Sequence, residues 1–123
     1  MTNLIVKWDA EGMHYWPDAP EEFAVYGHPH EHIFHFVCYL PVKVSSVEDR
    51  PLELLKVRRE LIKKMETKYG NPLNFGPMSC EGIAQSLYYI IRNGLAIRSK
   101  VVVMEDKFVG ADYSDLEFGL IQP

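Results

Sequence analysis

Residues 26–36 read Tyr-Gly-His-Pro-His-Glu-His-Ile-Phe-His-Phe and hold four of the five histidines of the chain. The hydrophobic residues that follow His30 predict a long strand over residues 30–44, interrupted only at Pro41. Because side chains alternate along a strand, His30 and His32 share one face, and His35 lies on the other. Their backbone positions are about 6–7 Å apart, since each residue advances a strand by about 3.3 Å. At this spacing two imidazoles can bind one metal ion.

The remaining histidine, His14, is the natural third ligand for such an ion. Zinc takes three or four protein ligands, and a catalytic zinc keeps one position open. We therefore expect His14, His30 and His32 to bind Zn²⁺. The alternative is a histidine-rich surface strand that binds no metal. The absence of a Cys-x-x-Cys motif favours this alternative.

The composition is that of one globular domain. The chain has 123 residues, of which 47% are hydrophobic and 24% charged, as in ordinary soluble domains. Its net charge of −4 argues against nucleic acid as the main partner, which would need a basic face. No apolar run approaches the roughly 20 residues that cross a bilayer, and we expect no membrane partner. The first residues do not resemble a signal peptide, and Cys38 and Cys80 read as reduced and buried, so we expect a cytoplasmic protein.

The predicted elements follow the order strand, strand, helix, helix, strand, strand. This order indicates an α+β fold with an antiparallel sheet. The first strand covers residues 3–8 and can continue to Trp16 past an irregularity at Gly12, and residues 17–22 form a loop. A first helix is capped by Asp49, has Pro51 in its first turn and ends at Gly70. The helix has a predicted inner face of Leu54, Arg58, Leu61 and Met65, with Leu55 and Ile62 beside it.

The second half of the chain completes this pattern. Residues 71–78 form a loop, and a second helix is capped by Ser79 and stops at Asn93-Gly94. Its predicted buried face consists of Ile83, Leu87, Ile90 and Ile91. A buried strand covers residues 101–104, and a last strand covers residues 108–120.

Four short motifs occur along the chain in a fixed order: His14; His-Glu-His-Ile-Phe at 30–34; Leu73-Asn74 followed by Met-Ser-Cys-Glu at 78–81; and Val-Val-Met-Glu at 102–105. Together they resemble the 6-pyruvoyl-tetrahydropterin synthase and 6-carboxytetrahydropterin synthase family, over nearly the whole chain. That family has a lone histidine on its first strand and His-Gly-His-x-Tyr opening its second. It has a Pro-Thr-x-Glu-like helix start after a Leu-Asn pair, and a strand that ends on a pterin-anchoring glutamate.

The resemblance implies that residues 1–123 form a single domain with the tunnelling fold. In this ββααββ fold several subunits close their antiparallel sheets into a β-barrel, with sites between subunits. We therefore expect a homo-oligomer, and a hexamer in particular. The resemblance also implies Zn²⁺ on His14, His30 and His32.

The same resemblance implies a pterin or purine-like ligand held by Glu105. A carboxylate accepts two hydrogen bonds, and a 2-amino-4-oxo pyrimidine edge offers two adjacent donors. The alternative is an acidic residue that only ends a buried strand. Ser79, Glu81 and Phe34 are candidates to line the pocket; helix capping is the alternative for the first two, and core packing for Phe34.

Two departures from the family pattern affect the expected reaction and not the expected fold. The family's cysteine lies a few residues before the His-x-His pair, where this chain has Tyr26, Gly27 and His28. The family's Leu-Asp-His should precede Leu73, but residues 68–72 read Lys-Tyr-Gly-Asn-Pro. The histidines that correspond to the family's metal ligands are retained, and the cysteine and Asp-His pair that carry out its proton transfer are absent. His28 is the candidate to replace them, since histidine titrates near neutral pH; the alternative is a loop histidine without a role.

Three functions are compatible with this pattern. The first is a divergent zinc-dependent synthase or lyase that acts on a pterin or purine-like compound. The second is a catalytically inactive relative that binds or sequesters a pterin or a nucleotide-derived molecule. The third is a structural barrel with an empty site.

Overall fold

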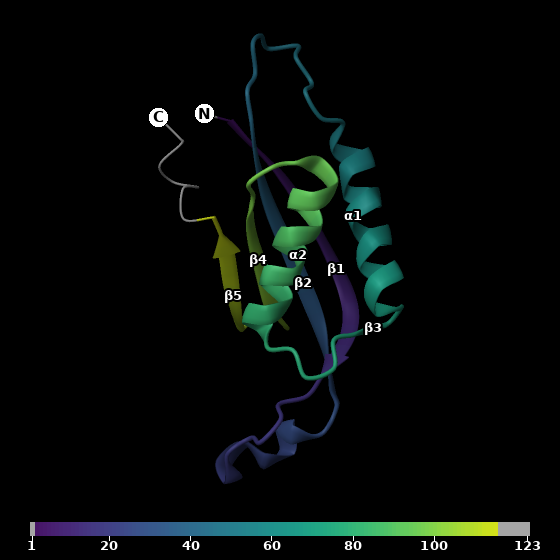
Figure 1. Cartoon of the computed structure of the whole chain (residues 1–123), viewed down its shortest axis with the longest axis vertical. Helices are drawn as coiled ribbons and strands as arrows, with labels where there is room; N and C mark the ends of the chain where they lie inside the picture. Colours follow the sequence, from purple (N-terminus) through teal and green to yellow (C-terminus); the bar gives the residue numbers. More distant parts are fainter. Residues whose placement is uncertain (1, 116–123) are drawn as a thin grey trace.

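The structure is a computed structural model and describes residues 2–115 (Figure 1). Its elements are β1 (Thr2–His14), the 3₁₀ helix η1 (Glu21–Gly27), β2 (His30–Val42), α1 (Leu54–Tyr69), β3 (Leu73–Asn74), α2 (Cys80–Leu95), β4 (Lys100–Glu105) and β5 (Val109–Ser114). The predicted α+β class is confirmed. None of the described helices is both long and apolar enough to cross a membrane.

The fold is built on one five-stranded sheet with the strand order β3-β1-β2-β4-β5. β1 and β2 run antiparallel over their whole length, from Thr2↔Val42 to His14↔His30. The β2–β4 and β4–β5 pairs are also antiparallel, as predicted. The sheet is open as far as the described residues extend, with β3 and β5 at its edges, so one chain does not form a barrel.

β3 is a short strand within the segment that was predicted to be a loop. It pairs parallel with β1 through Gly12↔Leu73 and Met13↔Asn74, so the sheet is not wholly antiparallel. Two residues are too few to show an alternating pattern, which explains why the sequence gives no strand signal there. The predicted irregularity at Gly12 is wrong, because Gly12 also pairs in regular register with His32.

The ends of β2 and β5 refine two other predictions. Pro41 lies beyond Tyr39↔Lys100, the last pair with β4, so β2 there pairs with β1 alone. That edge-like position is one that proline tolerates. β5 begins at Val109 rather than at Phe108 and ends at Ser114, and residues 116–120 of the predicted strand lie outside the described residues.

α1 starts later than predicted. Glu53 is its N-cap and accepts hydrogen bonds from the backbone N–H groups of Leu55 and Lys56. Asp49, the predicted cap, accepts instead from Ser45 in the preceding loop, and Pro51 lies before the helix. The buried face consists of Val57, Leu61 and Met65. Leu54 and Leu55 are exposed, because the first turn of the helix begins outside the core.

α2 begins as predicted and ends later. The Ser79 hydroxyl caps it by accepting from the Gly82 N–H, which confirms the predicted cap. The helix continues through Gly94 and ends with Ala96 in the left-handed conformation, at φ 55°. The predicted stop at Asn93-Gly94 is therefore wrong. The buried face consists of Ile83, Ala84, Leu87, Tyr88 and Ile91, and Leu95, which follows the pair, also packs against the core and favours the longer helix.

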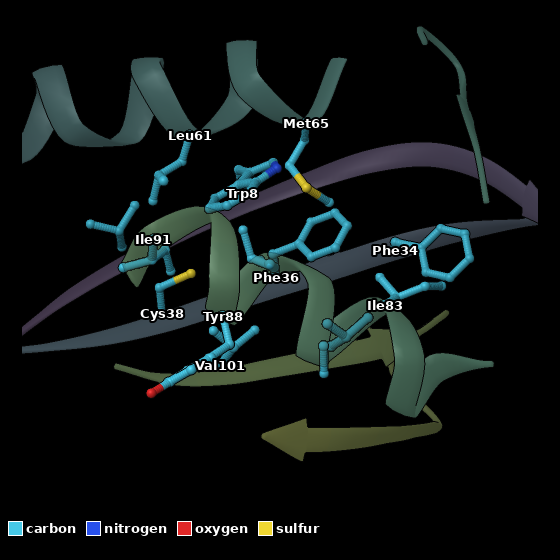
Figure 2. Close-up of a cluster of buried hydrophobic side chains, with 14 of the residues drawn as sticks. Trp8, Phe34, Phe36, Cys38, Leu61, Met65, Ile83, Tyr88, Ile91 and Val101 are labelled. Carbon is cyan, nitrogen blue, oxygen red and sulfur yellow. The ribbon is translucent and has the colours of Figure 1, made fainter. Parts of the chain in front are cut away.

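Both helices lie on one face of the sheet, α1 over β1 and α2 over β4 and β5 (Figure 1). Figure 2 shows the core between the two layers, with Trp8 and Phe36 stacked at a centroid distance of 5.0 Å. On the other face, Ile5 and Ile33 are exposed. The inner face of the β1–β2 hairpin continues beyond the core, and the histidines stand there.

Candidate metal centre

Three histidines converge where β1 ends and β2 begins. His14 pairs directly with His30, and His32 follows two residues later on the same inner face of β2. Their ring centroids are 4.6 Å apart for His14–His30, 4.9 Å for His30–His32 and 5.2 Å for His14–His32. One nitrogen from each ring lies within 4.8 Å of the other two. This is a donor set that one metal ion can bridge.

Each of the three rings is oriented by a hydrogen bond at Nδ1. His14 Nδ1 donates to the Met78 carbonyl and His30 Nδ1 to the His28 carbonyl, both at 3.0 Å. His32 Nδ1 lies 2.6 Å from Oδ2 of Asp106. A carbonyl or carboxylate oxygen can only accept, so in the neutral rings the hydrogen is on Nδ1 and the lone pair is on Nε2. This is the usual arrangement of metal-bound histidines.

His14 is the buried member of the group, at 8% exposure. Its Nε2 is buried and has no hydrogen-bond partner in the described part of the chain. Burial lowers the pKa of His14 and outweighs the Met78 carbonyl and Glu105, which act in the opposite direction. The neutral imidazole is the form that binds metals. A buried nitrogen lone pair without a donor is costly, and a metal ion would satisfy it.

Glu105 ends β4 and stands beside this group. Its Oε1 lies 3.4 Å from His14 Nε2, and its Oε2 lies 3.6 Å from His32 Nε2. When Nδ1 of His14 and of His32 carries the hydrogen, the carboxylate faces the lone pairs of both Nε2 atoms. Neither side can then donate a hydrogen bond to the other. A bound cation resolves this conflict, and the residues present therefore fit a divalent metal.

Phe34 lies behind the histidines. It is completely buried, and its ring meets those of His14 and His32 edge-on at 5.5 and 5.7 Å. Although it was a candidate to line the ligand pocket, Phe34 does not line the cavity beside the histidines that is described next. Its position supports the imidazoles from the core side.

A cavity of about 790 Å³ opens beside the three histidines. Trp16, Phe23 and Tyr26 form one wall, and Phe108 also lines the cavity. Trp16 and Phe23 stack at 5.8 Å and are only partly covered, at 45% and 40% exposure. Exposed flat rings beside a polar centre can stack on a planar ligand.

This aromatic wall comes from η1 and the segment before it, where the sequence predicted a loop over residues 17–22. The 3₁₀ helix covers Glu21–Gly27 and follows Pro20, with Glu21 and Glu22 in its first turn. Proline followed by acidic residues is a helix-start signal that was present in the sequence. Periodicity was absent, because none of the η1 residues is buried.

Ser79, Glu81 and Glu105, the residues predicted to contact a ligand, all line the cavity. Ser79 is also the α2 cap, so its hydroxyl accepts from Gly82 N–H. His28 is exposed, and its imidazole is not among the groups that line the cavity. Its backbone carbonyl contributes instead, by orienting His30.

His35 lies on the opposite face of the sheet, as predicted. Its Nδ1 lies 2.5 Å from Oδ1 of Asp9, the residue opposite it on β1. The pair has the same imidazole–carboxylate chemistry as His32 and Asp106 but, among residues 2–115, is not part of a group that could hold a metal ion.

Cys80 is the cysteine that lines the cavity. Its Sγ donates to the Val103 carbonyl at 3.3 Å. Burial, with Glu105 and Glu81 nearby, raises the pKa of this thiol to about 12. Cys80 is therefore a neutral thiol near pH 7 and a poor nucleophile.

Comparison with protein-family models and with curated protein sequences finds no match for this chain.

Proposed function

We propose that this protein binds one zinc ion through the Nε2 atoms of His14, His30 and His32 and holds a pterin or purine-like heterocycle in the adjoining cavity. The observation that carries the proposal is that all three rings are hydrogen-bonded through the same nitrogen, Nδ1. Each Nδ1 is engaged with an oxygen acceptor, and the three rings converge with Nε2 available. Imidazole also suits copper, nickel and iron, so the test below measures these metals as well.

The chain supplies three further parts of such a site. Zinc held by three histidines would offer an open position that polarises a ligand oxygen or activates a water molecule. Glu105 provides two acceptor oxygens next to that position, as a 2-amino-4-oxo pyrimidine edge requires. Trp16, Phe23 and Tyr26 provide stacking surface.

The first candidate function is a divergent zinc-dependent synthase or lyase acting on this heterocycle. The second is a protein that binds the heterocycle without turnover, and Cys80 favours it. The family's reaction uses an activated cysteine, whereas the thiol that lines this cavity has a pKa raised to about 12. Turnover assays with zinc-loaded protein separate the two functions.

The proposal includes assembly into a homo-oligomer, with a hexamer that closes a barrel as the specific form. The open sheet with two edges supports it, as do the exposed hydrophobic residues on the helix-free face, Ile5 and Ile33. A cytoplasmic location is also part of the proposal, supported by two cysteines that form no disulfide.

Metal content per chain tests the function directly. Protein purified without a metal-binding tag and analysed by elemental mass spectrometry should contain about one zinc per chain. His32→Ala should lose stoichiometric zinc, whereas His35→Ala should keep it, because His35 faces the other side of the sheet. Equal zinc retention by both variants would refute the ligand assignment, and another metal at one per chain would correct its identity.

A further inference from the structure

Asp106 connects the end of β4 to β2 through three hydrogen bonds. Its Oδ1 accepts from the Ile33 N–H at 2.7 Å, and its Oδ2 lies 2.6 Å from His32 Nδ1. Its own N–H donates to the Ile33 carbonyl at 2.9 Å. The residue adopts the left-handed conformation, at φ 52°. Both carboxylate oxygens are thus committed to a single dipeptide of β2, His32-Ile33.

We propose that Asp106 is a positioning residue of the metal centre, which fixes the tautomer and orientation of His32 so that Nε2 keeps its lone pair for the metal. This inference rests on the proposed function, because it assigns Asp106 a role toward the same ion. The carboxylate accepts from Nδ1–H, and the hydrogen therefore cannot be on Nε2 in the neutral ring. In metal sites such carboxylate partners orient the ligand and raise its basicity.

His32 is the ligand whose orientation depends on a side chain. His14 and His30 donate to backbone carbonyls, those of Met78 and His28. Substitution of Met78 or His28 would leave these acceptors in place. A single change at Asp106 can therefore alter the metal site without touching a ligand.

Asparagine at this position provides a sharp test, because it matches aspartate in shape and tolerates the left-handed backbone. Its amide oxygen can keep the bond from the Ile33 N–H, which leaves the amide NH₂ facing His32 Nδ1. A donor at that point requires Nδ1 to accept, and the ring hydrogen then moves to Nε2. The loss of function when a carboxylate partner of a histidine becomes an amide has the same cause in catalytic triads.

Glycine at this position gives a second, distinguishable result. Asp106→Gly suits the positive φ, removes the carboxylate and lets water accept from Nδ1–H. If Asp106 acts by fixing the tautomer, Asp106→Asn should weaken zinc binding more than Asp106→Gly does. If Asp106 only stabilises the turn, glycine, which loses every side-chain bond, should be at least as harmful as asparagine.

The experiment combines two measurements on the full chain. ¹⁵N NMR of metal-free protein at about pH 8, where ordinary histidines are neutral, reports the tautomer of each ring. Competition with a chromophoric chelator gives the zinc affinity. We expect His32 to carry its hydrogen on Nδ1 in the wild type and on Nε2 in Asp106→Asn, with affinity lowered about 10- to 100-fold. Asp106→Gly should lie between the two.

Asp9→Asn is the matched control, since it places the same amide opposite His35 Nδ1 on the other face of the sheet. No backbone N–H in the described structure fixes the Asp9 carboxylate, so the amide can turn its oxygen towards His35 Nδ1, and the zinc affinity should be unchanged. An Asp106→Asn variant with an unchanged His32 tautomer, or one no weaker than Asp106→Gly, would overturn the inference. A wild type that binds no metal would overturn the proposed function instead, and the tautomer of metal-free His32 would still decide whether Asp106 fixes this ring.

Discussion

Gly12 lies against the buried ring of Phe34, next to the three histidines. A Cβ atom on Gly12 would lie 3.0 Å from both Cδ2 and Cε2 of the Phe34 ring and 3.1 Å from the Leu73 carbonyl oxygen. The ring cannot retreat freely, because it is completely buried and meets Phe75 at 5.1 Å. Glycine at position 12 therefore leaves space for the Phe34 ring, and its φ is not in the left-handed region.

The first prediction follows from this contact. Gly12→Ala should lower the free energy of unfolding by about 1–3 kcal/mol, the usual cost of overpacking a core. It should also weaken zinc binding, because the displaced Phe34 ring supports His14 and His32. Urea denaturation of the metal-free protein and a zinc titration measure the two effects.

Gly27→Ala is the control for this substitution. A Cβ there would lie 3.5 Å from the Trp16 carbonyl, an ordinary contact, so both quantities should change little. A stable Gly12→Ala protein with unaltered zinc affinity would show that Phe34 does not hold the histidines in place.

The second prediction concerns the reactivity of Cys80. With its pKa raised to about 12, about one molecule in 10⁵ carries the thiolate at pH 7. Iodoacetamide should leave native Cys80 unmodified over times that fully alkylate the unfolded protein. Because the thiolate fraction increases as pH rises towards 12, reactivity should increase with pH and never fall. Peptide mass spectrometry resolves Cys80 from Cys38, whose thiol pKa is likewise raised to about 12 by burial.

Rapid alkylation of Cys80 in the folded protein would contradict this prediction. It would give the cavity a nucleophile and favour the enzyme over the binding protein.

The candidate metal ligands could be predicted from the sequence because the rule that places two of them together is local. Alternation along β2 puts His30 and His32 on one face irrespective of the rest of the fold. His14 required the register of β1 against β2, which brings it opposite His30. Likewise Ser79 was predictable as a cap, because a cap depends only on the next three residues.

The other parts of the site depend on contacts that no local pattern encodes. Asp106 and His32 are 74 positions apart and meet through a turn after β4 whose two left-handed residues, Asp106 and Lys107, are not glycines. No local pattern in the sequence therefore indicates that Asp106 lies beside His32. The η1 wall was missed because exposed aromatic residues show no burial periodicity. The later start of α1 reflects which turn of the helix reaches the sheet, and this is a tertiary effect.

The third prediction concerns assembly. Sedimentation velocity should give a mass well above the 14.2 kDa of one chain, with a hexamer as the specific expectation. The double variant Ile5→Lys, Ile33→Lys should dissociate or assemble more weakly, because it charges hydrophobic positions on the helix-free face of the sheet. Leu55→Lys is the control, since Leu55 is 76% exposed on α1 and its replacement should not affect assembly. A wild type that sediments only as a monomer would refute the expected homo-oligomer.

The last prediction separates two roles of Glu105. As the anchor of a 2-amino-4-oxo pyrimidine, its two oxygens accept from the ligand; as a fourth donor to the metal, the same oxygens face the ion near His14 and His32. Glu105→Gln keeps the shape, turns one acceptor into a donor and removes the charge. If Glu105 is the anchor, calorimetry on zinc-loaded protein should show pterin and guanosine binding about 10- to 100-fold more weakly, while zinc affinity measured without ligand is preserved. If Glu105 is a metal donor, zinc affinity falls first and ligand binding falls with it.

Glu81→Gln makes the same charge change at an exposed position of the cavity and should have the smaller effect. Equal losses in the two variants would mean that the cavity responds to charge alone and that Glu105 forms no paired hydrogen bonds with the ligand.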